Sequence, residues 1–250
     1  MSSDLGRGRM LDDAPGAIGV TIGAGCELPP LPDDALTHRT AGHFDPRRWF
    51  KDPTRRFEIE IGCGKGTFIL ETSQHEPTTN FLGIEWAREY YLYTADRLRR
   101  AQASNVRMLH TDASDFLRWR VQSNIAHVIH LYFSDPWPKT KHHKNRVIQH
   151  RFLAEAWRVL IPGGELRIVT DHDELWAWDR EHFDLWTNAS RWHEVPESAR
   201  TLWPMPAQPF SEHPFTPPAW VGEGQTVATN YERKMCVDRP PHACVLKKWD

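Results

Sequence analysis

Three acidic residues stand directly after three successive predicted strands, where a carboxylate can meet a bound ligand. Residues 125–133 are dense in apolar side chains and lead into Asp135-Pro136. Because proline cannot donate to a strand ladder, the strand must end before Asp135. Glu85 closes the apolar segment 80–85, and Asp112 follows the segment 106–110. In open α/β sheets, ligands bind in the crevice beyond the carboxyl ends of the strands, so these side chains predict a site at that edge.

A run of cationic side chains follows Asp135. Between 139 and 151 the chain has no acidic residue, three histidines and five cations, which are Lys139, Lys141, Lys144, Arg146 and Arg151. Such local asymmetry favours a polyanion, with Lys139, Lys141, Lys144 and Arg146 as phosphate contacts. Two plainer interpretations stay open: Asp135 caps the following turn, or the basic run is a solvated helix face.

A glycine loop precedes these strand ends. Gly62, Gly64 and Gly66 lie between an alternating strand, 57–61, and an apolar helix that begins at Thr67. Glycines there let the backbone approach a ligand, and free N–H groups at a helix N-terminus can meet a carboxylate or phosphate. The GxGxG spacing differs from the GxGxxG of dinucleotide-binding folds, which favours S-adenosyl-L-methionine over NAD. Glu85 then stands where such folds bind ribose, and Asp112 where a carboxylate can accept from adenine.

These residues need a parallel sheet to bring them together. The strands expected at 57–61, 80–85, 106–110, 125–133 and 165–171 are separated by helical segments that include 147–160 and 173–188. This alternation predicts a Rossmann-like α/β fold with a mostly parallel, seven-stranded sheet and helices on both faces. The proline-rich segment 196–218 is expected to be a surface connection, and residues 226–235 and 244–246 to supply the last strands.

Length and composition are typical of one domain with a sizeable core. The chain has 250 residues and a formal net charge of −2, so binding of a polyanion must depend on local charge. Residues 1–40 are expected to be a mobile arm and 41–250 a single domain. The four cysteines show no CxxC pair or metal-ligand spacing, and no segment reaches the roughly 18 apolar residues that span a bilayer. We therefore expect a soluble, cytoplasmic protein with no bound metal and no membrane association.

The quoted motifs resemble the bacterial tRNA (guanine-N(7)-)-methyltransferases from about Trp49 to Glu232. The matching residues are the glycine loop Glu60–Gly66, Gly83-Ile84-Glu85, Asp112-Ala113, Asp135-Pro136-Trp137-Pro138-Lys139, Thr170-Asp171 and Thr229-Asn230-Tyr231-Glu232. The resemblance implies a class I S-adenosylmethionine-dependent methyltransferase that methylates N7 of a guanosine in the variable loop of tRNA. It implies a cofactor site of Glu60, Gly62, Gly64, Gly66, Glu85, Asp112, Ala113 and Asp135, with Asp135 also catalytic. It implies substrate contacts from Lys139, Asp171, Thr229, Asn230, Tyr231 and Glu232.

The implied reaction needs no dedicated base, because N7 of guanine presents an in-ring lone pair. We expect catalysis by orientation, with Asp135 stabilising the positive charge that develops on the base, and Asp171 and Glu232 accepting hydrogen bonds from guanine.

Two positions depart from the family pattern: Ser134 stands in place of a proline and Asn230 in place of a lysine. A small-molecule methyltransferase and a catalytically silent tRNA-binding paralogue remain open, as do a monomer and a homodimer.

Overall fold

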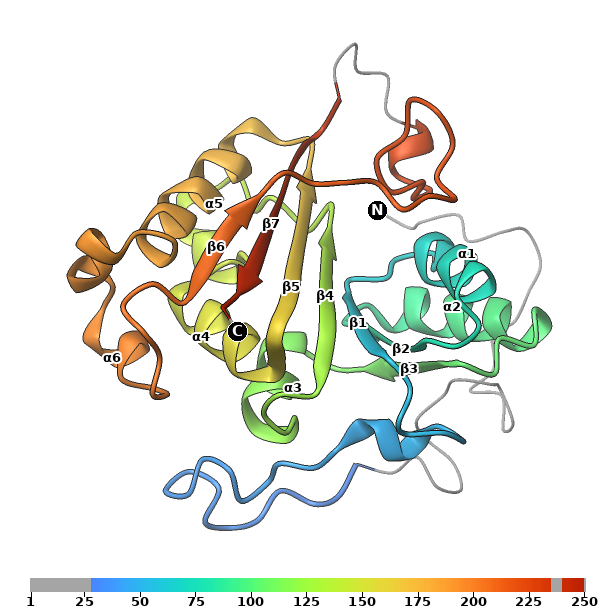
Figure 1. Cartoon of the computed structure of the whole chain (residues 1–250). Coiled ribbons are helices and arrows are strands. Elements are labelled where there is room, and N and C mark those ends of the chain that lie inside the picture. Colours follow the sequence, from blue (N-terminus) through green and yellow to red (C-terminus); the bar gives the residue numbers. More distant parts are fainter. Residues whose placement is uncertain (1–27, 235–239, 250) are drawn as a thin grey trace.

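The computed structural model describes residues 28–234 and 240–249 (Figure 1). Its strands are β1 (Phe57–Ile61), β2 (Asn80–Glu85), β3 (Val106–His110), β4 (Ala126–Tyr132), β5 (Leu160–Thr170), β6 (Phe210–His213) and β7 (His242–Lys248). The α-helices are α1 (Thr67–His75), α2 (Arg88–Arg100), α3 (Ala113–Arg120), α4 (His150–Val159), α5 (Asp173–Trp186) and α6 (Glu197–Arg200). Short 3₁₀ helices are η1 (Pro46–Trp49), η2 (Thr140–Asn145), η3 (Ala189–Glu194) and η4 (Glu232–Lys234).

The strands form one sheet in the order β3-β2-β1-β4-β5-β7-β6. Strands β1 to β5 are parallel, and the order reverses between β1 and β4, whereas β7 runs antiparallel to both β5 and β6. In doubly wound sheets this reversal is the point where ligands bind. The predicted Rossmann-like, mostly parallel seven-stranded sheet is confirmed, and the carboxyl ends of β1 to β5 share one edge.

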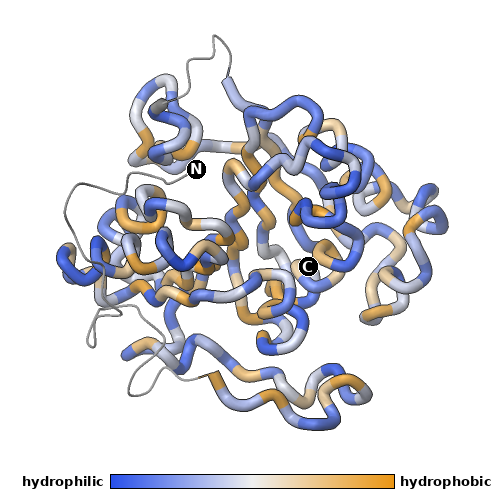
Figure 2. Tube along the Cα trace, turned by 180° about the vertical axis from the view of Figure 1, so that it is seen from behind, coloured by the Kyte–Doolittle hydropathy of each residue, from blue (hydrophilic) through white to orange (hydrophobic). Residues whose placement is uncertain are grey.

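Helices cover both faces of the sheet because side chains alternate along each strand. On β2, Phe81 packs with Tyr91 and Leu98 of α2, whereas its neighbour Leu82 belongs to the cluster that contains Phe152 of α4. Helices α1 and α2 therefore lie on one face, and α3, α4 and α5 lie on the other (Figure 1). Figure 2 shows apolar residues concentrated in the strands between these two layers.

The last strands differ from the sequence-based expectation. Residues 226–234 form turns and η4, not a strand, because the carboxylate of Glu232 collects the backbone N–H groups that a sheet ladder would need. The partner of β7 instead comes from Phe210–His213, inside the proline-rich segment. Since β6 pairs on one side only, it is an edge strand, the position that proline-rich neighbours tolerate.

Residues 28–40, which belong to the segment predicted to be an arm, contact the rest of the protein. Arg120 donates to the carbonyl of Pro29, Arg39 donates to that of Leu202, and Ala35 is buried. Residues 1–27 lie outside the described part of the chain, so the boundary at residue 40 stays a prediction. No helix in the described ranges is both long and apolar enough to cross a membrane.

Candidate active site

The glycine loop and the end of β2 are joined by hydrogen bonds from backbone to carboxylate. Gly64 N donates to Glu85 Oε2 and Ala87 N donates to Glu85 Oε1, both at 2.8 Å. Burial and the nearby Asp135 carboxylate raise the pKa of Glu85, while the two backbone donors oppose that shift. Glu85 thus holds the loop and lies within electrostatic range of Asp135, which joins two of the predicted strand-end carboxylates.

Helix α2 holds the same loop from its other side. The Thr94 hydroxyl donates to Gly64 O at 2.8 Å, and Arg97 donates to Lys65 O. Gly66 has a φ of +66°, and a Cβ there would lie 2.2 Å from Thr94 Cγ2, so both backbone conformation and space require glycine. These roles of Thr94 and Arg97 were not predicted from the sequence. The only indication in the sequence was that Thr94, a polar residue, lies on the apolar face of the helix. Nothing in the sequence indicated the role of Arg97.

Glu60 is a buried carboxyl group with one unpartnered oxygen. It is 4% exposed, and its Oε2 atom has no hydrogen bond within the described part of the chain. Burial, together with the nearby Glu85 carboxylate, raises the pKa of Glu60 to about 8. Unpaired buried acids are costly, and such groups cluster at functional sites. Glu60 lies near the end of β1, beside the glycine loop, and its contact with a cofactor stays a prediction.

Asp112 and Ala113 begin α3 after the third strand. Asp112 is the N-cap, and its Oδ1 accepts from Asp115 N at 2.9 Å. The carboxylate is exposed at the carboxyl edge of the sheet, two strands away from β1. This capping bond is a structural role that the sequence analysis did not assign, and the predicted adenine contact stays a prediction.

Asp135 lies in an unusual backbone segment at the end of β4. Phe133 and Trp137 have φ values of +52° and +43°, a region in which bulky residues are strained. The Asp135 side chain is exposed and has no hydrogen bond or ion pair to the described residues. No backbone N–H of the following turn is therefore bound by it, which argues against the capping interpretation. A free carboxylate on a strained turn suits contact with a ligand.

The segments after β5 and before β7 meet beside Asp135. Tyr231 Oη donates to Asp171 Oδ2 at 3.3 Å, and the Tyr231 ring lies 5.2 Å from that of Phe133. The structure thus brings Asp171 and the segment 229–232, which includes Asn230, close to the turn that carries Asp135.

Glu232 has a structural role that the sequence did not indicate. Its Oε2 accepts from Val227 N and Ala228 N at 3.0 and 2.7 Å, its Oε1 accepts from Thr226 N, and its own N–H donates to Thr229 Oγ1. Glu232 and Thr229 therefore close the loop, and the guanine contact of Glu232 stays a prediction. The loop in turn presents Tyr231, which is 55% exposed.

The basic run divides into exposed lysines and one buried arginine. Lys139, Lys141 and Lys144 are exposed in and beside η2, as phosphate contacts must be. Arg146 is only 3% exposed, and its guanidinium donates to Pro136 O and Glu174 Oε1. Its Nε and one Nη2 donor are therefore bound within the protein, a structural role that the sequence did not indicate, and its contact with phosphate stays a prediction.

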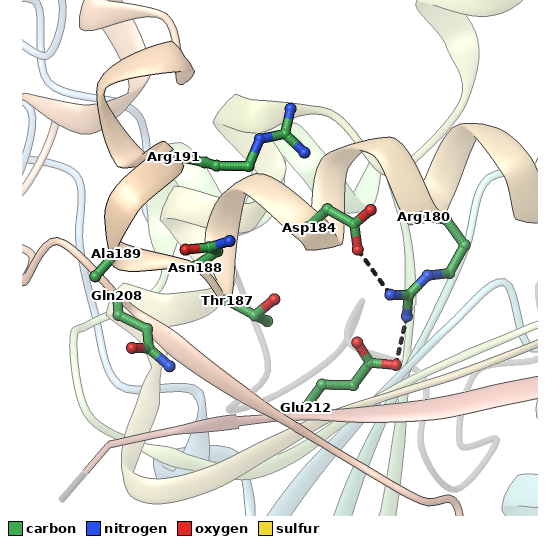
Figure 3. A pocket seen from close by; sticks show the side chains of 8 residues that line it. All are labelled: Arg180, Asp184, Thr187, Asn188, Ala189, Arg191, Gln208 and Glu212. Atoms are coloured by element: carbon green, nitrogen blue, oxygen red, sulfur yellow. Dashed lines mark hydrogen bonds and ion pairs between the residues drawn. The ribbon is translucent and has the colours of Figure 1, made fainter.

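A separate pocket of about 480 Å³ lies away from this edge. It is lined by Arg180, Asp184, Thr187, Asn188, Ala189, Arg191, Gln208 and Glu212, near the end of α5 and β6 (Figure 3). Arg180 is neutralised there by Asp184 and Glu212, and Arg191 by Glu194, so the pocket lacks the free charge that an anion needs. Within residues 28–234 and 240–249, no three His, Cys, Asp or Glu side chains are grouped to hold a metal ion.

The residues at the carboxyl edge fit S-adenosyl-L-methionine. A Cβ on Gly62 or Gly64 would meet no atom within 4 Å, so the loop faces open space. The unpartnered Glu60 oxygen and the Glu85 carboxylate supply acceptors for the amino and hydroxyl groups of such a ligand. S-adenosyl-L-methionine is the cofactor of this fold class, and the residues present can hold it.

Comparisons with known proteins agree with this fold. Residues 54–210 match the family described as "Putative methyltransferase". The crystal structure of a 30S ribosomal A1408 methyltransferase from an uncultured bacterium has a TM-score of 0.50 and 12% sequence identity, and the match covers 90% of this chain and 97% of that one. At this identity the likeness shows the fold alone.

Similar sequences include proteins named tRNA (guanine-N(7)-)-methyltransferase. That of Nitrobacter hamburgensis is 35% identical over 170 residues, which cover 65% of this chain and 66% of that protein. That of Geobacillus thermodenitrificans is 38% identical over 50% of this chain and 57% of that protein, so the chain spans less than two thirds of the length of both relatives. That of Brevibacillus brevis is 33% identical over 157 residues, 71% of its length. The family match over residues 54–210 and the similarity to these relatives show that the chain belongs to the methyltransferase family that includes the bacterial tRNA (guanine-N(7)-)-methyltransferases.

Proposed function

We propose that this protein transfers a methyl group from S-adenosyl-L-methionine to N7 of a guanosine in the variable loop of tRNA, in the cytoplasm. One observation carries the proposal: a glycine loop, three interacting carboxylates and a lysine-bearing loop lie together at one edge of the sheet. Glu60, Glu85 and Asp135 form the acidic side of this edge, since Glu85 lies within electrostatic range of both Glu60 and Asp135. Lys139, Lys141 and Lys144 form its cationic side.

The acidic side suits a positively charged methyl donor. When bound, S-adenosyl-L-methionine supplies an electrophilic methyl group on a sulfonium centre. The in-ring lone pair of guanine N7 would accept this methyl group as the carbon–sulfur bond is broken, so the protein needs no residue to remove a proton first. Positive charge moves onto the guanine ring, and the exposed Asp135 carboxylate stabilises it there. Asp171 and Tyr231, which are hydrogen bonded to each other, orient the base beside Asp135.

The cationic side suits an RNA backbone. Lysine side chains on the exposed η2 loop meet phosphates as point charges, which gives affinity that falls with salt and carries little sequence information. Recognition of one guanosine therefore depends on the shape of the tRNA and on the residues that surround the flipped or exposed base. The tRNA names of the relatives support this choice of polyanion.

The test is an in vitro reaction with the full chain, labelled S-adenosyl-L-methionine and tRNA from cells that lack this modification. We expect label in N7-methylguanosine after digestion to nucleosides. Label in another nucleoside, or none with a protein that binds the cofactor, would refute the proposal.

A further inference from the structure

Arg146 lies at the junction of three parts of the active-site region. Its Nε donates to Pro136 O at 2.9 Å, one residue from Asp135, and its Nη2 donates to Glu174 Oε1 at 2.8 Å, on the first turn of α5. Its guanidinium also lies 5.2 Å from the ring centroid of Trp178, one turn further along the same helix. One side chain therefore binds the Asp135 turn and helix α5 together.

The same loop is braced from within. Gln149 Nε2 donates to the carbonyls of His143 and Arg146 at 3.0 and 3.3 Å, and the Trp137 ring stacks on His142 at 5.8 Å. Other contacts reach α5 from the far end of the loop: Trp178 Nε1 donates to Ile148 O at 2.8 Å, and His143 Nε2 lies 3.4 Å from Glu174 Oε1. Arg146 differs from these contacts because it binds α5 and the Pro136 carbonyl beside Asp135 at once, with the planar fork that binding a carboxylate and a carbonyl together needs.

We propose that Arg146 is a positioning residue that fixes the 134–149 loop on α5 and thereby sets the place of Asp135 and of the exposed lysines. This inference rests on the proposed function. Arg146 touches neither substrate nor cofactor in this role. A rigid loop keeps the reacting carboxylate in place before RNA arrives, which is where orientation contributes most to rate.

Glu174 provides the decisive variant because its side chain is 54% exposed and its loss should not threaten folding. If Arg146 contacted phosphate, Glu174→Ala would free the arginine, remove a competing negative charge and tighten tRNA binding. If Arg146 holds the loop, Glu174→Ala loosens the loop and lowers kcat about tenfold, and tRNA binding does not tighten. Glu181→Ala is the matched control, since it removes the same charge from an exposed position on the same helix.

Hydrogen exchange of the 134–149 peptides gives a readout that needs no activity. We expect faster exchange in Glu174→Ala and in Arg146→Lys, which keeps the charge but loses the fork, and exchange like the unmodified protein in Glu181→Ala. Lys144→Met should leave exchange unchanged while reducing the slope of log affinity against log salt by about 1. Arg146→Lys should leave that slope unchanged.

Three results would overturn the inference: tighter tRNA binding by Glu174→Ala, unchanged exchange in both Glu174→Ala and Arg146→Lys, or full turnover by Arg146→Lys. Failure of the proposed function is distinguishable from these, because the unmodified protein would then methylate no tRNA while the exchange results still stand.

Discussion

Replacing Glu60 by glutamine should stabilise the cofactor-free protein. The carboxyl group is buried without a partner on Oε2, and burial raises its pKa to about 8 from an ordinary value of 4.5. The folded protein therefore holds a proton that the unfolded chain releases above pH 4.5. Since the folded pKa is the higher one, the folded state is favoured below pH 4.5 and loses stability as the pH rises towards 8. Glutamine has the same shape and no charge to lose.

The size of the effect follows from the two pKa values. Relative to glutamine, the carboxyl group destabilises the fold by about 1 kcal/mol at pH 5, about 3 kcal/mol at pH 7 and about 5 kcal/mol at pH 9. The advantage of Glu60→Gln should therefore grow by about 4 kcal/mol between pH 5 and pH 9. Any constant difference in packing between the two side chains cancels in this slope.

Urea unfolding of both proteins at several pH values measures the slope directly. Glu58→Gln is the matched control, from the same strand and equally buried. Although burial alone would raise it, the hydrogen bond and charge of His130 lower the pKa of Glu58 to about 2, so its removal should destabilise the protein. Parallel curves for Glu60→Gln and the unmodified protein would refute the reasoning, because they would mean that Glu60 is ionised and solvated. The same variant should bind S-adenosyl-L-methionine more weakly, as expected when a binding site retains a group that costs stability.

Three further predictions concern the site and its surroundings. Asp135→Ala should keep cofactor and tRNA binding within about tenfold but lose most turnover in single-turnover assays, and unchanged turnover would restore the turn-capping interpretation. Thr94→Val removes the hydrogen bond to Gly64 O and should weaken cofactor binding about tenfold in calorimetry, whereas Thr94→Ser keeps the hydroxyl and should bind normally. Equal cofactor affinity in the two variants would exclude a role of this hydrogen bond in binding. Burial raises the pKa of Asp179 to about 8, although the nearby Arg146 opposes the shift. The unfolding free energy of Asp179→Asn should therefore increase relative to that of the unmodified protein as the pH rises from 4 to 8. No gain would show that Asp179 is charged in the folded protein.

The sequence predicted the strands of the site well because their ends are marked by local chemistry. The alternating Phe57–Ile61, the glycine loop and the proline after Asp135 each fix a boundary within a few residues. The parallel order then places Glu85, Asp112 and Asp135 on one edge without further information.

Residues whose role depends on distant partners were less predictable. In the sequence, Arg146 is one of several neighbouring cations. Its partners Glu174 and Trp178 lie about thirty residues later, and only the fold brings them beside it. In the sequence, Glu232 looks like a free acid. In the structure it binds three nearby backbone N–H groups, because the loop adopts a conformation that the sequence pattern does not predict. The strand Phe210–His213 was hidden among prolines, because its pairing depends on β7, about thirty residues later.

The positive φ values of Phe133 and Trp137 have a mechanical consequence. Glycine would adopt either angle at less cost, but it would have no ring to place against Tyr231 or His142. Asp135 thus lies between two aromatic contacts. Phe133 packs against Tyr231 in the segment before β7, and Trp137 packs against His142 in the lysine-bearing loop. The two ring contacts hold the Asp135 turn from both sides, so a nucleic acid meets the carboxylate already in place.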